Sequence, residues 1–139
     1  MNKKLYKRDG RRFVPVEDLT GEIREVEGTK AICVLQTTTE RCWATIDAPN
    51  KRMTHCQAIE YVKTQFNGKG VLPSRSLLLI LQNKYKEKVN AHNWYYWTAD
   101  VYERASDSAA WALGWSGGYV YYGNKGDTLY VRAFLIEKI

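Results

Sequence analysis

The sequence has little of what metal sites and disulfide frameworks require. It contains two histidines, His55 and His92, and three cysteines, Cys33, Cys42 and Cys56. These residues form no CxxC pair and no zinc-like spacing. We therefore expect free, mostly buried thiols in a reducing compartment, and neither a metal nor a cofactor.

Long apolar runs are also missing. No stretch reaches the roughly 18 residues that a membrane span needs, and the start MNKKLYKRDGRRF lacks the apolar region of a secretory signal. We expect no membrane insertion and synthesis in the cytoplasm without export. The length of 139 residues and the three prolines indicate one globular unit without long rigid linkers.

Catalytic motifs are scarce as well. No carboxylate pair has an evident role, and the segment Gly123–Asp127 (GNKGD) lacks the spacing and following helix of a phosphate-binding loop. His55 and Cys56 are adjacent, and neighbouring side chains on a helix point about 100° apart, so they do not make a Cys–His nucleophile. We expect a protein that is not an enzyme.

What the sequence does have is a basic start. The formal net charge is +6, and outside the first twelve residues the charges nearly balance. We predict that residues 1–29 form a basic extended arm that is either solvated or attached to another subunit. Its basic residues are Lys3, Lys4, Lys7, Arg8, Arg11 and Arg12.

Residues 30–88 predict two strands and then two helices. β-forming residues favour a strand at 30–36 and a hairpin partner at 41–46. Thr54 and Gln57 fit a capping box, and apolar residues recur at helical spacing up to Gly68. A second helix with a broad apolar stripe begins after Pro73, with Ser74 as its N-cap.

After Asn93 the pattern changes to short aromatic runs punctuated by glycine, which predicts an antiparallel β-meander. Turns are expected at Ser116–Gly118 and Gly123–Asp127. The four strands are expected near residues 95–98, 110–115, 119–122 and 129–135. Two helices packed on such a meander give an α+β fold for the domain 30–139.

Arg132 lies between apolar neighbours in the last predicted strand. We expect it to be partly buried, to pair with a carboxylate such as Asp100 or Asp107, and to have a structural role.

The order of several short motifs resembles one known family. Val71-Leu72-Pro73-Ser74 precedes the leucine-rich helix, Tyr96-Trp97-Thr98 follows it, and Tyr130-Val131-Arg132 lies near the end. In this order and spacing, residues 30–134 resemble the Lcl C-terminal domain family. The family's tryptophan before Leu-Pro and the acidic residue of its second helix are absent here. The resemblance implies a C-type-lectin-like fold of the kind found in bacterial surface proteins and phage structural proteins, which bind glycans or other surface groups.

Aromatic and turn residues of the C-terminal half are candidate ligand contacts. Alternation along a strand sends Trp111, Leu113 and Trp115 to one face, which favours core packing for them. Exposed tyrosines near the hairpins suit binding, because each phenol combines a large contact area with a hydrogen-bonding tip. Asn124 and Asp127 fit either a polyol contact or an ordinary turn. The candidate set is Trp97, Trp115, Tyr119, Tyr121, Tyr122, Asn124 and Asp127.

Our leading hypothesis is a phage virion component, such as a head or tail fibre or a capsid decoration subunit. The lectin-like domain would bind host or mucosal glycans, the arm would attach to other virion proteins, and avidity favours a homo-oligomer, for which we expect a trimer. One alternative is a bacterial surface adhesin module. Another is a cytoplasmic nucleic-acid-binding protein that uses the basic arm and exposed aromatics, with strongly salt-dependent binding.

Overall fold

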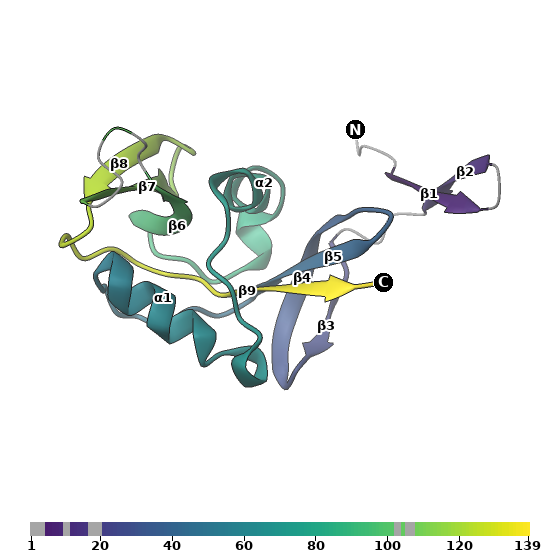
Figure 1. Ribbon diagram of the computed structural model, residues 1–139, viewed down its shortest axis with the longest axis horizontal. Helices are drawn as coiled ribbons and strands as arrows, with labels where there is room; N and C mark the ends of the chain where they lie inside the picture. Colours follow the sequence, from purple (N-terminus) through teal and green to yellow (C-terminus); the bar gives the residue numbers. More distant parts are fainter. Residues whose placement is uncertain (1–4, 10–11, 17–20, 102–103, 105–107) are drawn as a thin grey trace.

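The computed structural model describes residues 5–9, 12–16, 21–101, 104 and 108–139, and for residues 5–16 the backbone alone. The described part has two α-helices and two larger antiparallel sheets, so the predicted α+β class is confirmed (Figure 1). Strands β1 (Leu5–Asp9) and β2 (Arg12–Val16) form a separate antiparallel hairpin. Of the predicted arm, Lys3, Lys4 and Arg11 lie outside the described residues.

The first sheet contains four antiparallel strands in the order β3-β4-β5-β9. These strands are β3 (Ile23–Val26), β4 (Thr29–Gln36), β5 (Glu40–Thr45) and β9 (Phe134–Lys138). The predicted hairpin of residues 30–36 and 41–46 is confirmed as β4 and β5. Val26 of β3 pairs with Thr29 of β4, so the predicted domain boundary after residue 29 falls inside the β3–β4 hairpin. Strand β3 is an edge strand of this sheet.

Both predicted helix starts are confirmed. Helix α1 (His55–Lys63) begins with the capping box, in which the Gln57 amide N–H donates to Thr54 Oγ1 over 3.3 Å and the Thr54 N–H donates to Gln57 Oε1 over 3.0 Å. Helix α2 (Arg75–Tyr85) begins at Ser74, whose Oγ accepts from the Leu77 N–H over 3.2 Å. The α-helical part of the first helix ends at Lys63, and a 3₁₀ turn (Phe66–Gly68) follows before the predicted stop at Gly68.

The second sheet has three antiparallel strands in the order β6-β7-β8: β6 (Tyr95–Val101), β7 (Ala109–Gly114) and β8 (Val120–Asn124). They match the first three predicted strands of the meander. The turn between β7 and β8 includes Gly118, whose φ of +69° suits glycine. Strand β8 is an edge strand of this sheet.

The fourth strand of the predicted meander is wrong. Residues 129–135 do not pair with β8; the chain crosses to the first sheet, where β9 pairs with β5 (Figure 1). The physical reason is that this segment is buried on both faces. Leu129, Val131, Ala133 and Leu135 pack in one core cluster, whereas Phe134 packs in the other. A segment buried on both faces needs packing on each side, which the exposed edge of β8 does not provide.

Each helix closes one of the two core clusters. Ala58 and Val62 of α1 pack with Trp43 of the first sheet and Trp97 of the second. On the other side, the leucines of α2 pack with both sheets, and Figure 1 shows α2 between them; this cluster includes Ile32, Val34, Leu78, Leu81, Tyr96 and Leu113. The crossing segment therefore lies at the centre of the molecule, and the free edge of β8 lies at one end.

Candidate functional site

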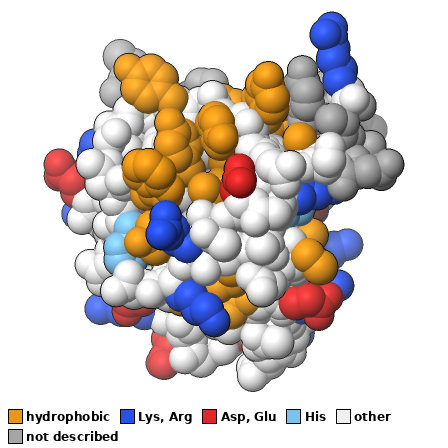
Figure 2. All heavy atoms as spheres, turned by 90° about the vertical axis from the view of Figure 1, so that its left-hand side faces the viewer, with side chains coloured by type: hydrophobic (Ala, Val, Ile, Leu, Met, Phe, Trp, Pro, Cys, Tyr) orange, Lys and Arg blue, Asp and Glu red, His pale blue; other side chains and the backbone are white. Residues whose placement is uncertain are grey.

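Exposed aromatic side chains gather at the end of the molecule where β8 lies. Tyr119 is 72% exposed, and Trp94, Tyr121 and Tyr122 are each 41–51% exposed. Figure 2 views this end and shows hydrophobic side chains forming a continuous patch, with basic and histidine side chains at its border. We call Trp94, Tyr95, Tyr119, Tyr121 and Tyr122 the aromatic surface.

The rings of the aromatic surface contact one another in sequence. The centroids of Trp94 and Tyr95 are 5.4 Å apart with an edge-to-face angle of 79°, and those of Tyr95 and Tyr121 are 5.0 Å apart. Tyr121 and Tyr122 lie 6.5 Å apart with nearly parallel planes. Such contacts add to the stability of each ring's position, so Trp94, Tyr95, Tyr121 and Tyr122 form a connected platform, and the exposed Tyr119 lies in the turn that leads into β8.

Glycines allow these rings to lie close to the backbone. A Cβ at Gly117 would lie 2.4 Å from the ring of Tyr119, and one at Gly123 would lie 2.9 Å from the ring of Tyr121. Real Cβ atoms do not approach so closely. The glycines in these turns led us to predict the hairpins. They also leave room for the tyrosine rings against the backbone.

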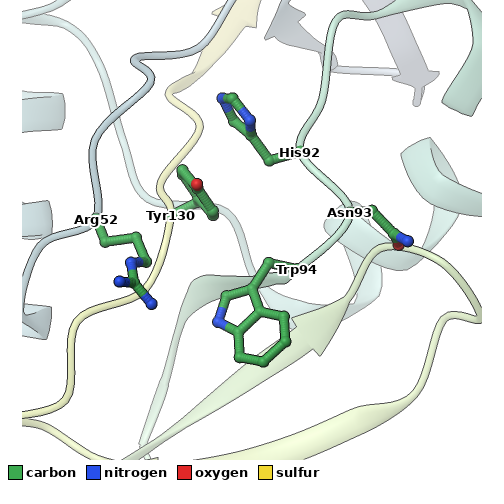
Figure 3. A pocket seen from close by; sticks show the side chains of 5 residues that line it. All are labelled: Arg52, His92, Asn93, Trp94 and Tyr130. Carbon is green, nitrogen blue, oxygen red and sulfur yellow. The ribbon is translucent and has the colours of Figure 1, made fainter.

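A hollow of about 340 Å³ adjoins the aromatic surface at Trp94. Its lining residues are Arg52, His92, Asn93, Trp94 and Tyr130. Figure 3 shows the side chains of Arg52, Tyr130 and Trp94 around the opening, with Asn93 on the opposite side from Arg52. The rings of His92 and Tyr130 are stacked, with centroids 4.3 Å apart and an interplanar angle of 13°.

Backbone hydrogen bonds hold the three segments that line the hollow. Met53, which follows Arg52, exchanges two hydrogen bonds with Leu129, at 2.8 and 2.9 Å. The Tyr130 N–H donates to Tyr95 O over 3.1 Å, and the His92 N–H donates to the Tyr96 hydroxyl over 2.8 Å. The hollow is thus anchored to strand β6 and is formed before any ligand arrives.

Two of the predicted contact residues are buried and cannot stack on a ligand. Trp97 is fully buried and donates its indole N–H to Met53 O over 2.9 Å; Trp115 is 6% exposed, and its backbone N–H donates to Trp94 O over 2.9 Å. Both tryptophans therefore support the hollow from beneath, because they fix the segments that carry Arg52 and Trp94.

Asn124 and Asp127 occupy the turn after β8. The Gly126 N–H donates to Asn124 Oδ1 over 2.8 Å, and the Asp127 N–H donates to Asn124 O over 2.9 Å. These bonds define an Asx-type turn, so both residues take the ordinary turn role that the sequence also allowed. Both side chains are exposed. Asp127 also lies near Tyr121, since a Cβ at Gly123 would be 3.6 Å from Asp127 Oδ2 and 2.9 Å from the Tyr121 ring.

Arg132 is fully buried, and its predicted pairing with Asp100 is wrong. Its guanidinium donates to the backbone carbonyls of Thr45, Ile46 and Asn90. Asp100 instead accepts from the Arg75 N–H at the start of α2, over 2.7 Å, and Asp107 lies outside the described residues. Carbonyl oxygens from two chain segments, residues 45–46 and residue 90, are the partners of the buried cation here, whereas its buried Nε has no hydrogen-bond partner among the described residues.

Two adjacent residues with reactive side chains, His55 and Cys56, do not face each other. His55 is buried and its Nε2 lies 2.9 Å from Thr98 O; since a carbonyl only accepts, Nε2 carries the proton. Burial lowers the pKa of His55 below 6.5. Cys56 is exposed, so the two side chains diverge as expected. Among the described residues, no group of three or more His, Cys, Asp or Glu side chains could hold a metal ion.

Sequence reasoning found the tyrosines of β8 but missed the hollow. Trp94 and Tyr95 open the aromatic run after Asn93, and that run was a usable signal. For His92 and Tyr130 the sequence held no comparable signal, because their stacking depends on a contact between segments 38 residues apart in sequence. Arg52 reaches the same place from a third segment.

Comparisons with protein-family models and with curated proteins were made for the full sequence. No protein-family model matches this sequence, and no curated protein is similar enough to count as a match. In the part of the chain that the structure describes, no helix has the length and apolar character to cross a membrane.

Proposed function

We propose that this chain is a non-enzymatic recognition protein whose aromatic surface binds a carbohydrate. The observation that carries the proposal is the connected set of exposed rings beside a polar hollow. Carbohydrate rings have apolar C–H faces and polar edges. Aromatic rings cover the former, and phenol, amide and guanidinium groups hydrogen-bond the latter.

The same geometry suits adhesion better than tight capture of a small molecule. The aromatic surface is open and lies at one end of the molecule (Figure 2). Each site of this kind binds weakly, and several sites on one particle gain avidity. A homo-oligomer, for which a trimer is the simplest expectation, would present the sites together.

The resemblance to the Lcl C-terminal domain family supports a C-type-lectin-like identity for residues 30–139 and a role in a phage virion, as a fibre or capsid decoration subunit. In this proposal the basic N-terminal segment attaches the chain to other virion proteins. In the same proposal, attachment by this segment and glycan binding by the aromatic surface are separate functions.

A glycan array followed by titration calorimetry tests the proposal. Tyr119→Ala and Trp94→Ala should each weaken binding of the best glycan at least fivefold, because each removes an exposed ring without opening a core cavity. Ile139→Ala is the matched control: it removes an apolar side chain that is 62% exposed at the C-terminus, and binding should not change.

One outcome of these experiments would favour nucleic-acid recognition over carbohydrate binding. If the array shows no binder, and single-stranded nucleic acid binds with strong salt dependence, the basic segment and the rings serve nucleic-acid recognition instead.

A further inference from the structure

Among the described residues that line the hollow beside the aromatic surface, one is a strong cation and none is an acid. Of its five lining residues, Arg52 carries a permanent positive charge and none is Asp or Glu. Its volume of about 340 Å³ lies at the low end of the range for ligand pockets, roughly 300–1,000 Å³. A pocket of this size and charge suits one small ring with one negative group.

Arg52 is free to bind such a group. It is exposed, and no described carboxylate lies within 4.0 Å of its guanidinium, in contrast to Arg24 and Arg41, which both pair with Glu137. The neighbouring Met53 is tied to Leu129 by two hydrogen bonds, so the stem of Arg52 starts from a fixed position. A ligand therefore need not displace an existing ion pair.

Trp94 supplies an apolar wall on the same hollow. Its indole is 48% exposed, and its backbone is fixed by the Trp115 N–H on one side and by its own hydrogen bond to His92 O, at 2.9 Å, on the other. In Figure 3 the indole and the guanidinium both lie below Tyr130, with no labelled side chain drawn between them. One ligand can therefore contact both groups.

We propose that this hollow binds a sugar residue that carries a carboxylate, with the ring against Trp94 and the carboxylate paired with Arg52. The planar guanidinium matches a carboxylate through two parallel hydrogen bonds. The inference rests on the proposed carbohydrate function and adds the ligand class: an acidic monosaccharide unit, as in a uronic acid.

The test compares two probes that differ in one group, methyl β-glucuronide and methyl β-glucoside, by NMR titration of the full chain. The glucuronide should bind about tenfold more tightly, which corresponds to about 1.4 kcal/mol and is the size expected for charge-assisted hydrogen bonds. Arg52→Gln should remove this preference, so that the variant binds the two sugars with equal affinity. Lys51→Gln is the matched control, since it removes an adjacent exposed cation that does not line the hollow.

The possible failures are distinguishable. If both sugars bind equally and Arg52→Gln changes neither, the carboxylate inference is wrong and the carbohydrate function stands. If a sulfated glucoside shows the larger Arg52-dependent gain, the hollow selects sulfate and the proposed ligand class is wrong. If Trp94→Ala leaves the binding of both probes intact, the hollow is not their site.

Discussion

At the scale of single residues, one buried cation organises the region behind the candidate site. Arg132 connects the end of β5 with the loop that leads to His92, through carbonyls of Thr45, Ile46 and Asn90. Its guanidinium also lies 5.9 Å from the Tyr96 ring centroid and 5.8 Å from that of Trp115. The sequence predicted its structural role, but the carbonyl partners come from distant segments that no local pattern identifies.

Replacing Arg132 should therefore destabilise the whole fold. Arg132→Met should lower the free energy of unfolding by about 3 kcal/mol, because one buried and two partly buried carbonyls lose a charged donor. Arg132→Lys should recover only part of this loss, since an ammonium group cannot span the three carbonyls. Chemical denaturation measures both. Equal stability of Arg132→Met and wild type would show that these bonds contribute nothing net.

His55 predicts a dependence of stability on pH. Burial lowers its pKa in the folded state below the ordinary 6.5, so the unfolded chain binds the proton more readily. The unfolding free energy should fall as the pH decreases below 6.5, until the folded-state pKa is passed. His55→Gln keeps a donor for Thr98 O and should flatten this part of the pH profile. An unchanged slope between about pH 7 and pH 5 in the variant would assign the effect to other groups.

The cysteines predict selective labelling. Burial raises the pKa of both Cys33 and Cys42 to about 11, whereas Cys56 is exposed at the start of α1. Since the thiolate is the reactive form, iodoacetamide at neutral pH should add one label to the folded protein and three after denaturation, as read by mass spectrometry. Cys56→Ser should take no label while folded. Rapid labelling of that variant would mean that the β4–β5 core opens readily.

At the scale of elements, the sequence predicted correctly those features that depend on residues close together in the chain. The capping box at Thr54, the Ser74 cap and the β4–β5 hairpin depend on neighbours in sequence, and all were found. The path of residues 129–138 depends on pairing with β5, some ninety residues earlier, and was mispredicted. An apolar alternating segment fits several positions in an α+β fold, so periodicity alone does not choose among them.

A close approach at the element scale gives a further prediction. A Cβ at buried Gly70 would lie 2.0 Å from Val62 O, where the chain leaves α1 and turns toward α2. Gly70→Ala should cost roughly 2 kcal/mol or more of stability, because the backbone itself must shift. Gly126→Ala is the comparison, since its nearest contact would be Asn124 Oδ1 at 3.1 Å on an exposed turn. Similar melting temperatures for the two variants would contradict the claim that the close approach to Val62 O makes Gly70 necessary.

At the scale of the whole molecule, two sheets and two helices enclose a shared core and leave the end with β8 open. The sequence predicted that aromatic residues near the hairpins would serve binding, and Tyr119, Tyr121 and Tyr122 are indeed exposed together. Strand alternation already favoured core packing for Trp115, but no local pattern separated Trp97 from the exposed tyrosines, because it lies in a similar aromatic run and only the packing of the two sheets buries it.

The most direct test of the account is chemical-shift mapping on the isotope-labelled chain during titration with a glycan that it binds. We predict that the largest shifts fall on the Trp94 indole and on residues 119–122, with assignment of the indole by Trp94→Phe, and that the α2 end near Lys84 stays unperturbed. Shifts that instead cluster on residues 5–16 or near Lys84, with Trp94 unmoved, would contradict the claim that the aromatic surface is the binding site.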